Sequence, residues 1–306
     1  MSETRSLIAS LLNQLDQVIL GKTDTIRLAV CCLLADGHLL LEDVPGVGKT
    51  TLAHALATSL GLRFQRIQFT SDMLPADLIG VSIYERERGE FRFHPGPVFS
   101  QIVLADEINR ATPRTQSALL EAMEEGQVTL DGETYVLPEP FFVIATQNPM
   151  QQTGTFALPE SQLDRFLMRL SLGYPDPVAE RAMLMGESRR DMLARMQAAV
   201  SDEAMRELRQ AVKAVHVSIA LVDYVQALVQ ATRERADWVN GLSPRAALGL
   251  IQAARAHALV SGRTFAAPDD VQAVFVAVAS HRLQSSSAGR QDVAQVARLL
   301  AEVAIP

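Results

Sequence analysis

The sequence is poor in cysteine, and it has no long apolar run and no excess of basic residues. Its only two cysteines, Cys31 and Cys32, are adjacent. No second pair exists from which a disulfide framework or a zinc site could be built, so we interpret both as small buried hydrophobic residues. No apolar stretch approaches the ~20 residues that a membrane-spanning helix needs. The first ten residues lack the basic start and apolar centre of a signal peptide, which favours the cytoplasm.

The charge balance argues against nucleic acid as the main partner. The chain of 306 residues has 28 Lys and Arg residues against 35 Asp and Glu residues, a formal net charge of −7. Phosphate contacts need a local excess of basic side chains, so a nucleic-acid site would have to lie on a local basic loop. The six histidines show no metal-ligand spacing. The length suits two domains better than one compact core.

The first half of the chain alternates short apolar runs with helical stretches, a pattern typical of a mostly parallel sheet covered by helices. Five runs are expected to be strands: Leu39–Leu41, Phe64–Phe69, Ile102–Ala105, Phe142–Ala145 and Phe166–Leu170. Four of them are almost continuously apolar, as strands buried on both faces are. In the run that begins at Phe64, polar and apolar residues alternate, which suits an edge strand. The predicted fold class is therefore α/β.

Two hairpins are predicted to interrupt this alternation. One spans Val128–Val136 and turns at Asp131-Gly132, a pair that readily takes the positive φ angles of a type I′ turn. The other joins Val81–Tyr84 to Glu90–Phe93 through a charged tip. The hairpins either decorate the surface or contact a partner or substrate, and the sequence favours neither alternative.

The second half of the chain is predicted to be all-helical. After a turn that ends near residue 175, Asp176 can cap a helix whose first residue is Pro177. Two further pairs begin helices in the same way: Ser243-Pro244 and Ala267-Pro268. We therefore divide the chain into an α/β domain, residues 1–175, and a helical domain, residues 176–306.

A glycine-rich loop follows the first predicted strand. Residues 43–50 lie between that strand and a helical stretch, which is the context of a phosphate-binding P-loop. Gly46 and Gly48 permit the backbone angles that direct N–H groups at a phosphate. Lys49 would reach the β- and γ-phosphates of ATP, and the Thr50 hydroxyl would bind Mg²⁺. The full cofactor-binding stretch is Pro45, Gly46, Val47, Gly48, Lys49, Thr50 and Thr51.

The loop departs from the strict pattern at Asp43, where the motif has glycine. We expect the Asp43 side chain to point outward, so that the geometry of the loop is kept. A second Gly-Lys-Thr, residues 21–23, lacks both a preceding glycine-rich loop and a strand. It is therefore not a phosphate site.

Acidic and amide residues follow the next two buried strands. Asp106 and Glu107 come directly after Ile102–Ala105, at the strand end where doubly wound sheets bind ligands. Asp106 would hold Mg²⁺ through water, and Glu107 would orient or deprotonate the attacking water. Asn148 follows Phe142–Ala145 and is placed to sense the γ-phosphate or to position water, although asparagine at a strand end is also a common turn residue.

Together these motifs resemble those of the MoxR family of AAA+ ATPases. The resemblance rests on Glu42–Thr51, Ala105–Gln116, Ala145–Pro149, Leu158–Phe166 and Ser243–Arg245, which span most of the chain. It implies a P-loop AAA+ core with a helical lid, assembled as a homo-oligomeric ring that is often a hexamer. It also implies Mg²⁺-dependent ATP hydrolysis that remodels protein clients or matures them by metal-cofactor insertion, often beside a partner with a von Willebrand factor A domain.

The resemblance assigns roles to residues outside the P-loop. Arg165 resembles the arginine finger that reaches into a neighbour's nucleotide site, where a guanidinium would meet the charge on the γ-phosphoryl group. The alternative is that Arg165 pairs with Asp164 or Glu160 at the surface. Arg245 resembles the second sensor, which would contact the γ-phosphate in its own subunit. The weaker candidates for the subunit interface are Arg110, Arg114 and Arg169.

Two further segments resemble parts of the same family. Val18, Ile19 and Gly21 resemble the segment that lines the adenine pocket. The two predicted hairpins match insertions that project toward the central pore or toward bound clients in related ATPases.

Other functions are weighed against this one. A nucleic-acid motor or loader would need a basic hairpin, but Val128–Val136 has no Lys or Arg, and the charged tip of the other hairpin is balanced in sign. A non-hydrolysing nucleotide switch would not need Glu107, Asn148, Arg165 and Arg245 together. Nothing in the sequence suggests the acceptor site of a small-molecule kinase.

Overall fold

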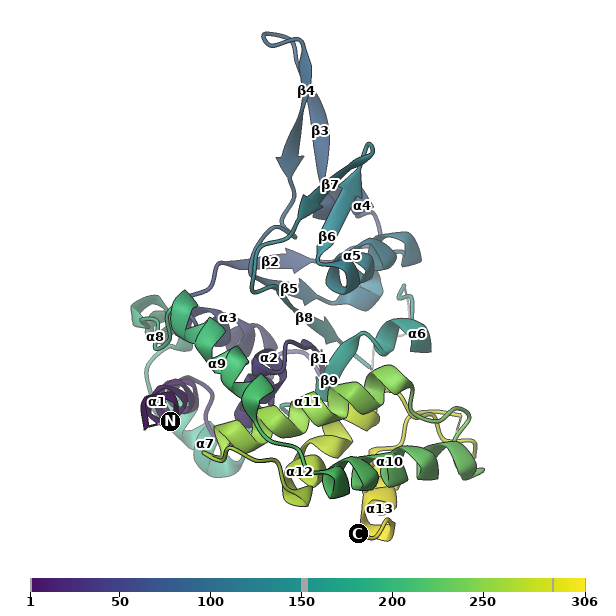
Figure 1. Ribbon diagram of the computed structural model, residues 1–306. Coiled ribbons are helices and arrows are strands. Elements are labelled where there is room, and N and C mark those ends of the chain that lie inside the picture. The colour runs from purple at the N-terminus through teal and green to yellow at the C-terminus, as the bar shows by residue number, and fades with distance from the viewer. Residues whose placement is uncertain (1, 150–153, 288, 306) are drawn as a thin grey trace.

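The computed structural model describes residues 2–149, 154–287 and 289–305. At its centre lies a five-stranded sheet whose strands all run parallel, in the order β2-β5-β8-β1-β9 (Figure 1). The strands are β1 (His38–Glu42), β2 (Phe64–Gln68), β5 (Ile102–Asp106), β8 (Phe142–Gln147) and β9 (Phe166–Leu170). The five predicted strands are confirmed, and β2 lies at an edge of the sheet, as its polar residues indicated.

Both faces of the sheet are covered because successive strand residues point to opposite sides. Leu40, Val103 and Val143 point to one face and join an apolar cluster with α5. Leu39 and Ile144 point to the other face and join a second cluster with α1, α2 and α3. The four covering helices are α1 (Ser2–Val18), α2 (Thr23–Leu34), α3 (Lys49–Ser59) and α5 (Pro113–Glu125). Two short helices precede α5 in the chain: α4 (Pro75–Ile79) and η1 (Ile108–Arg110).

The two predicted hairpins are present, and both project from the same end of the molecule (Figure 1). They are formed by β3 (Gly80–Glu85) with β4 (Glu90–Pro95) and by β6 (Gln127–Leu130) with β7 (Glu133–Val136). Asp131 and Gly132 have φ angles of 53° and 85°, the positive values of the predicted turn. Phe93 of β4 stacks on Tyr135 of β7 with ring centroids 3.9 Å apart. The stack joins the two hairpins.

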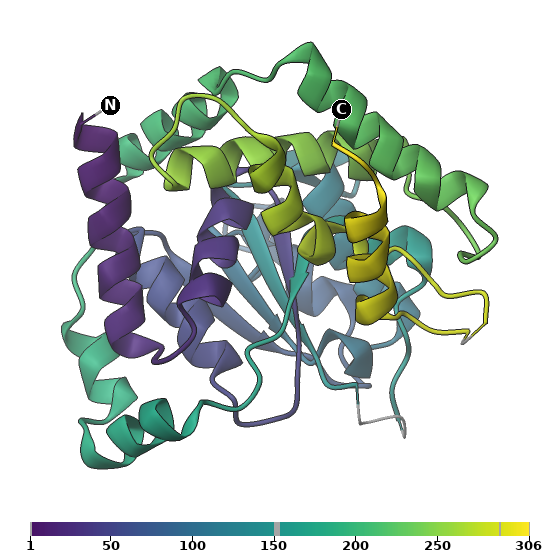
Figure 2. The ribbon, with the colours of Figure 1, turned by 90° about the horizontal axis from the view of Figure 1, so that it is seen from below.

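The second half of the chain is helical, as predicted. Its helices and the short helix before β9 are α6 (Glu160–Leu163), α7 (Pro177–Met185), α8 (Arg189–Arg195), α9 (Asp202–Ala214), α10 (Ile219–Glu234), α11 (Pro244–Val260), α12 (Pro268–Ala279) and α13 (Val293–Glu302). Asp176 and Ser243 cap α7 and α11 with their side chains, and α12 begins at Pro268. Helix α11 packs against α2 and α12, and α12 packs against β9 (Figure 2).

The helical half shares its core with the sheet. Leu250 of α11 and Val274 of α12 belong to the same apolar cluster as Leu11 of α1 and Leu39 of β1. The predicted division after residue 175 is thus not a division between two cores, and it stays a prediction. Among the described residues, no helix is long and apolar enough to cross a membrane.

The two cysteines lie in this shared core, as the sequence indicated. Both are on α2, both are fully buried, and neither forms a disulfide. Burial raises the pKa of the Cys32 thiol to about 12 and raises the pKa of Cys31 as well. They pack as small apolar residues and are kept in the thiol form.

Candidate nucleotide-binding site

The P-loop connects β1 to α3 at the carboxyl edge of the sheet, as predicted. Gly46 and Gly48 have φ angles of 85° and 99°, which residues with a Cβ rarely adopt. Gly48 is the N-cap of α3, and no side chain of the described residues caps that helix. The first N–H groups of α3 are therefore free to bind an anion, and the helix dipole favours negative charge there.

The side chain of Lys49 is folded back on its own loop. Its Nζ donates to the carbonyl oxygens of Asp43 at 2.6 Å and of Val44 at 3.1 Å. Burial lowers the pKa of Lys49, while the nearby charges of Asp43, Asp106 and Glu107 act in the opposite direction. The charge of Lys49 is thus near enough to Asp106 and Glu107 to interact with them.

Asp43 does not point outward, so that expectation was wrong. Its Oδ2 accepts hydrogen bonds from Ser171 Oγ at 2.9 Å and from the backbone N–H groups of Leu172 and Gly173, both at 2.6 Å. Its Oδ1 accepts from the N–H of Val44 at 3.0 Å. Burial acts to raise the pKa of this carboxyl group, but the hydrogen bonds outweigh it and hold the pKa below its ordinary value. Asp43 ties the P-loop to the segment after β9.

Asp106 is held at the end of β5 by neighbours on both sides. Its Oδ1 accepts from Thr146 Oγ1 of β8 at 2.6 Å. Its Oδ2 accepts from Arg66 of β2, with Nη2 at 2.6 Å and Nε at 3.1 Å. The Arg66 side chain is half exposed, whereas that of Asp106 is largely buried.

Glu107 shares Thr146 with Asp106 and has two further partners of its own. Its N–H donates to Thr146 Oγ1 at 2.8 Å, and its Oε2 accepts from Gln68 of β2 at 3.1 Å and from Arg110 at 3.0 Å. The residue has a φ of 56°, an uncommon conformation for a residue other than glycine that is often found at functional sites.

Sequence reasoning missed three polar residues that hold the acidic pair: Arg66, Gln68 and Thr146. The polar residues of β2 were interpreted only as a sign of an edge strand. Because β2 is parallel to β5 and Gln68 lies opposite Asp106 in the register, they also reach the acidic pair. The signal in the sequence was the row of polar residues in β2, because an edge strand beside a strand that ends in carboxylates can donate hydrogen bonds to them.

Asn148 lies where the sequence placed it. It follows β8, which lies between β1 and β5 in the sheet, so it stands between the P-loop and the acidic strand. The residue is 6% exposed. Its role as a sensor stays a prediction.

The segment predicted to line the adenine pocket lies between α1 and α2. Val18 and Ile19 are buried in the apolar cluster. Gly21 has a φ of 69° and lies against Asp176 and Ala179, where an added Cβ would come within 2.9 Å of both. The segment therefore packs on the start of α7, and its contact with adenine stays a prediction.

Arg165 and Arg245 lie together at the amino edge of the sheet, opposite the P-loop. Arg165 directly precedes β9, and its Nε is 3.1 Å from Glu124 Oε2. Arg245, at the start of α11, pairs with the other oxygen of Glu124. The expected contact of Arg245 with a γ-phosphate in its own subunit is therefore absent from this geometry. The alternative pairing of Arg165 with Asp164 or Glu160 was also wrong, because its partner is Glu124.

The three weaker interface candidates differ in their surroundings. Arg169 is 12% exposed at its side chain and pairs with Glu42 at 2.7 Å inside the subunit, which corrects the expectation that it faces a neighbour. Arg110 pairs with Glu107. For Arg114 the interface role stays a prediction.

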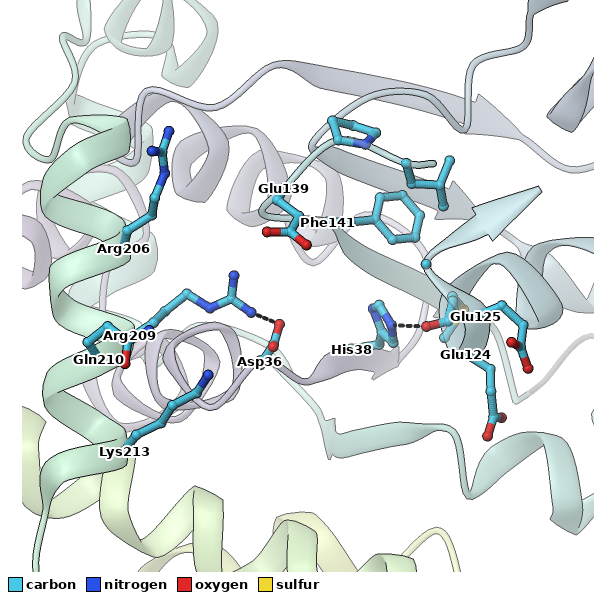
Figure 3. Close-up of a pocket in the computed structure, with 14 residues that line it drawn as sticks. Asp36, His38, Glu124, Glu125, Glu139, Phe141, Arg206, Arg209, Gln210 and Lys213 are labelled. Atoms are coloured by element: carbon cyan, nitrogen blue, oxygen red, sulfur yellow. Dashed lines mark hydrogen bonds and ion pairs between the residues drawn. The ribbon is translucent and has the colours of Figure 1, made fainter. Parts of the chain in front are cut away.

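A cavity of about 580 Å³ opens at the amino edge, away from the P-loop. Figure 3 shows Arg206, Arg209 and Lys213 of α9 along one side of the cavity, with Asp36 paired to Arg209, and Glu124 and Glu125 on the opposite side. His38 lines it, and its Nδ1 accepts from Val143 N–H while its Nε2 donates to the Met123 carbonyl. Burial lowers the pKa of His38 to about 4. Both ring nitrogens are thus used in holding β1 in place.

The residues predicted to hold Mg²⁺ are Thr50, in the first turn of α3, and Asp106, at the end of β5; this role stays a prediction. Within the described ranges there is no cluster of three or more His, Cys, Asp or Glu residues suited to a metal. Mg²⁺ does not need one, because it usually keeps several waters and is held by one or two carboxylates and substrate phosphates. The hydroxyl and carboxylate oxygens fit this chemistry, provided that Arg66 yields or shares the Asp106 carboxylate.

Comparisons with known proteins identify the family of the chain. Residues 38–168 match the ATPase family associated with various cellular activities (AAA), and residues 230–302 match the AAA lid domain. YeaC of Bacillus subtilis is 44% identical over 98% of this chain and 95% of its own length. Chaperone MoxR1 of Mycobacterium tuberculosis is 43% identical over 88% of this chain and 74% of its own length.

A solved structure supports the same assignment. A crystal structure of a Cytophaga hutchinsonii protein, described as a candidate ATPase, superposes with a TM-score of 0.89 at 37% identity. The match covers 100% of this chain and 96% of the other. Residues 38–168 are thus an AAA core, residues 230–302 are an AAA lid, and the chain belongs to the MoxR family of AAA+ ATPases.

Proposed function

We propose that this ATPase uses Mg²⁺-dependent hydrolysis of ATP to remodel or mature protein clients, as a homo-oligomeric ring such as a hexamer. The observation that carries the ring is the separation of the hydrolytic residues. Lys49 and Glu107 lie at the carboxyl edge of the sheet, whereas Arg165 and Arg245 lie at the amino edge. A five-residue strand is about 16 Å long, so neither arginine reaches a γ-phosphate in its own subunit.

A neighbouring subunit could place its own nucleotide within reach of Arg165 and Arg245. If the amino edge of one copy faces the carboxyl edge of the next, the two arginines of the first meet the nucleotide of the second. Such a head-to-tail contact closes into a ring when the rotation between copies allows it. Glu124 would then release or share the two guanidinium groups that it now binds.

At the carboxyl edge each residue has a separate task. The N–H groups at the start of α3 and the Lys49 ammonium would hold the phosphates, and Thr50 and Asp106 would hold Mg²⁺, which neutralises phosphate charge. Glu107 would orient or deprotonate the attacking water. Its carboxylate now accepts from Gln68 and Arg110, so those two residues would set its direction.

ATP turnover per subunit, measured against protein concentration, tests the ring. We expect a rate that climbs and then saturates as the assembly forms. Arg165→Ala should lower kcat by roughly 10³-fold or more and leave ATP affinity unchanged. The matched control is Arg235→Ala, which breaks an ion pair with Glu302 elsewhere in the lid. A full rate in protein shown to be monomeric, with Arg165→Ala equally active, would exclude the ring mechanism.

The β3–β4 hairpin supports a protein client. Tyr84 and Phe91 face each other with ring centroids 5.2 Å apart, and Phe91 is 73% exposed. Exposed apolar groups on a projecting element mark interaction sites. The residues at and near the tip are balanced in sign, which leaves no net positive charge for nucleic acid: Arg86, Arg88 and Arg92 against Glu85, Glu87 and Glu90. Arg88 and Arg92 both pair with Glu85. A partner with a von Willebrand factor A domain is proposed by family analogy alone.

Client binding is tested by capture in the ATP-bound state. Glu107→Gln should retain ATP without turnover, and its bound proteins can be recovered by cross-linking. Adding Phe91→Ser should remove those proteins, whereas Val293→Ser, which alters an exposed apolar residue of the lid, should not. Stimulation of turnover by DNA, with no captured protein, would favour the nucleic-acid alternative. A cytoplasmic location stays a prediction.

A further inference from the structure

Asp164, the residue before Arg165, is bound from two helices of the lid. Its Oδ1 accepts from Arg282 Nε at 2.6 Å, and its Oδ2 accepts from Ser243 Oγ at 3.0 Å. Arg282 follows the end of α12, and Ser243 is the N-cap of α11. One carboxylate therefore joins the segment that carries Arg165 to both helices.

The Arg282 guanidinium also binds the backbone of the segment around Arg165. Its side chain is 5% exposed, and it donates to the carbonyl oxygens of residues 164, 166 and 167 at 3.0, 2.7 and 3.1 Å. These carbonyl groups lie on both sides of Arg165. The backbone from which the Arg165 side chain extends is thus fixed by a buried cation of the lid.

The second arginine is tied to the same point. Ser243, which donates to Asp164, also accepts from the N–H of Ala246 and so fixes the first turn of α11. Arg245 lies in that turn. Its guanidinium and that of Arg165 meet on Glu124. The two arginines therefore share an anchor at their backbones as well as a partner at their tips.

We infer that Asp164 is a positioning residue for hydrolysis in the neighbouring subunit, because it sets the relative placement of Arg165 and Arg245. The inference rests on the proposed function, in which both arginines act on a neighbour's nucleotide. A long flexible side chain acts on a transition state only if its backbone is held in place, and a displacement of about 1 Å can cost 10²-fold in rate. A satisfied buried polar network supplies that rigidity.

Asp164→Ala should lower kcat by about 10²-fold and leave ATP affinity unchanged, because the P-loop is at the other edge. Asp164→Asn should have a smaller effect, since its amide oxygen still accepts from Arg282. The control is Asp270→Asn, which alters a fully buried carboxylate of the lid that pairs with Arg263 at 2.5 Å. If Asp164 had a merely structural role, Asp164→Ala and the control Asp270→Asn would lower kcat alike, and this result would overturn the inference.

Mixed assemblies separate a defect in the neighbour from a defect in the subunit itself. Lys49→Ala subunits are expected not to bind ATP but carry intact arginines, so they should restore turnover when mixed in equal amounts with the slow Asp164→Ala subunits. In a randomly mixed ring about half of the Asp164→Ala sites would gain such a neighbour. If Asp164→Ala fails to fold, Asp164→Asn takes its place in the same mixture.

The Arg165→Ala protein, mixed with Lys49→Ala, distinguishes failure of the inference about Asp164 from failure of the ring mechanism. Rescue of both the Arg165 and the Asp164 variants supports the inference. Rescue of Arg165→Ala alone overturns the inference and leaves the ring mechanism standing. No rescue of Arg165→Ala, from subunits shown to assemble, overturns the ring mechanism and the inference with it.

Discussion

Replacing Asp43 by glycine would bring the P-loop to the strict sequence pattern, yet we expect the change to destabilise the protein. The carboxylate accepts four hydrogen bonds, one within the loop and three from residues 171–173 after β9. Glycine would leave those donors without their acceptor. It would also add backbone freedom to the unfolded chain, at about 0.5–1 kcal/mol.

The size of the effect follows from the bonds. A hydrogen bond to a charged group contributes about 1.5–3 kcal/mol. Four bonds that share two oxygens do not add independently, and water can reach part of the site, so we expect a loss of about 3 kcal/mol. With urea slopes of roughly 1–3 kcal/mol per M, the unfolding midpoint should fall by about 1 M or more.

Urea unfolding of the wild type, Asp43→Gly and Asp43→Asn at pH 7 measures this effect. Ser171→Ala, which removes a single donor, should lose only part of it. Because the folded pKa of Asp43 lies below its ordinary value, its contribution is complete above the unfolded pKa of about 3.9. It is lost as the pH falls through the lower folded pKa, so the wild type and Asp43→Asn should converge below about pH 4. An Asp43→Gly protein as stable as the wild type would refute this reasoning.

Three further expectations concern the acidic pair and the buried thiols. Thr146→Val removes the hydroxyl that joins Asp106 to the N–H of Glu107, so kcat should fall about tenfold or more, whereas Thr146→Ser should stay active; an active valine variant would contradict this role. Arg66→Ala frees Asp106 from a half-exposed ion pair worth up to about 1 kcal/mol, so the Mg²⁺ concentration for half-maximal turnover should fall by up to about fivefold. An unchanged or higher Mg²⁺ requirement would show that Arg66 and Mg²⁺ do not compete for Asp106. The two adjacent cysteines should resist alkylation at pH 8 in the folded protein and react in urea, because burial raises their pKa; rapid labelling of folded protein would be inconsistent with this.

The features predicted correctly from the sequence depend on neighbouring residues. Buried strands are marked by apolar runs, the P-loop by its glycines between a strand and a helix, and the starts of α7 and α11 by Asp176 and Ser243 before proline. The type I′ turn at Asp131-Gly132 is of the same kind. In each case the physical cause lies within a few residues.

The features that were missed depend on the strand order and on long-range packing. Arg66 reaches Asp106 only because β2 lies beside β5, and Asp43 meets residues 171–173 only because β1 lies beside β9. Arg245 was placed near its own P-loop because the sequence does not show how the lid helices pack on the sheet. Glu124, the partner of both arginines, carries no local signal at all.

The apolar cluster shared by α1, β1 and α11 limits how the subunit can move. If the lid swung away from the sheet, it would expose Leu250 of α11 and the apolar side chains of α2 and β9 on which the lid helices pack. Exposing roughly 400 Å² of apolar surface would cost about 10 kcal/mol, as much as the whole stability of many domains. Motion on hydrolysis is then expected as rotation of entire subunits against one another. The β3–β4 and β6–β7 hairpins, joined by the stack of Phe93 on Tyr135, would move together with that rotation as one rigid unit.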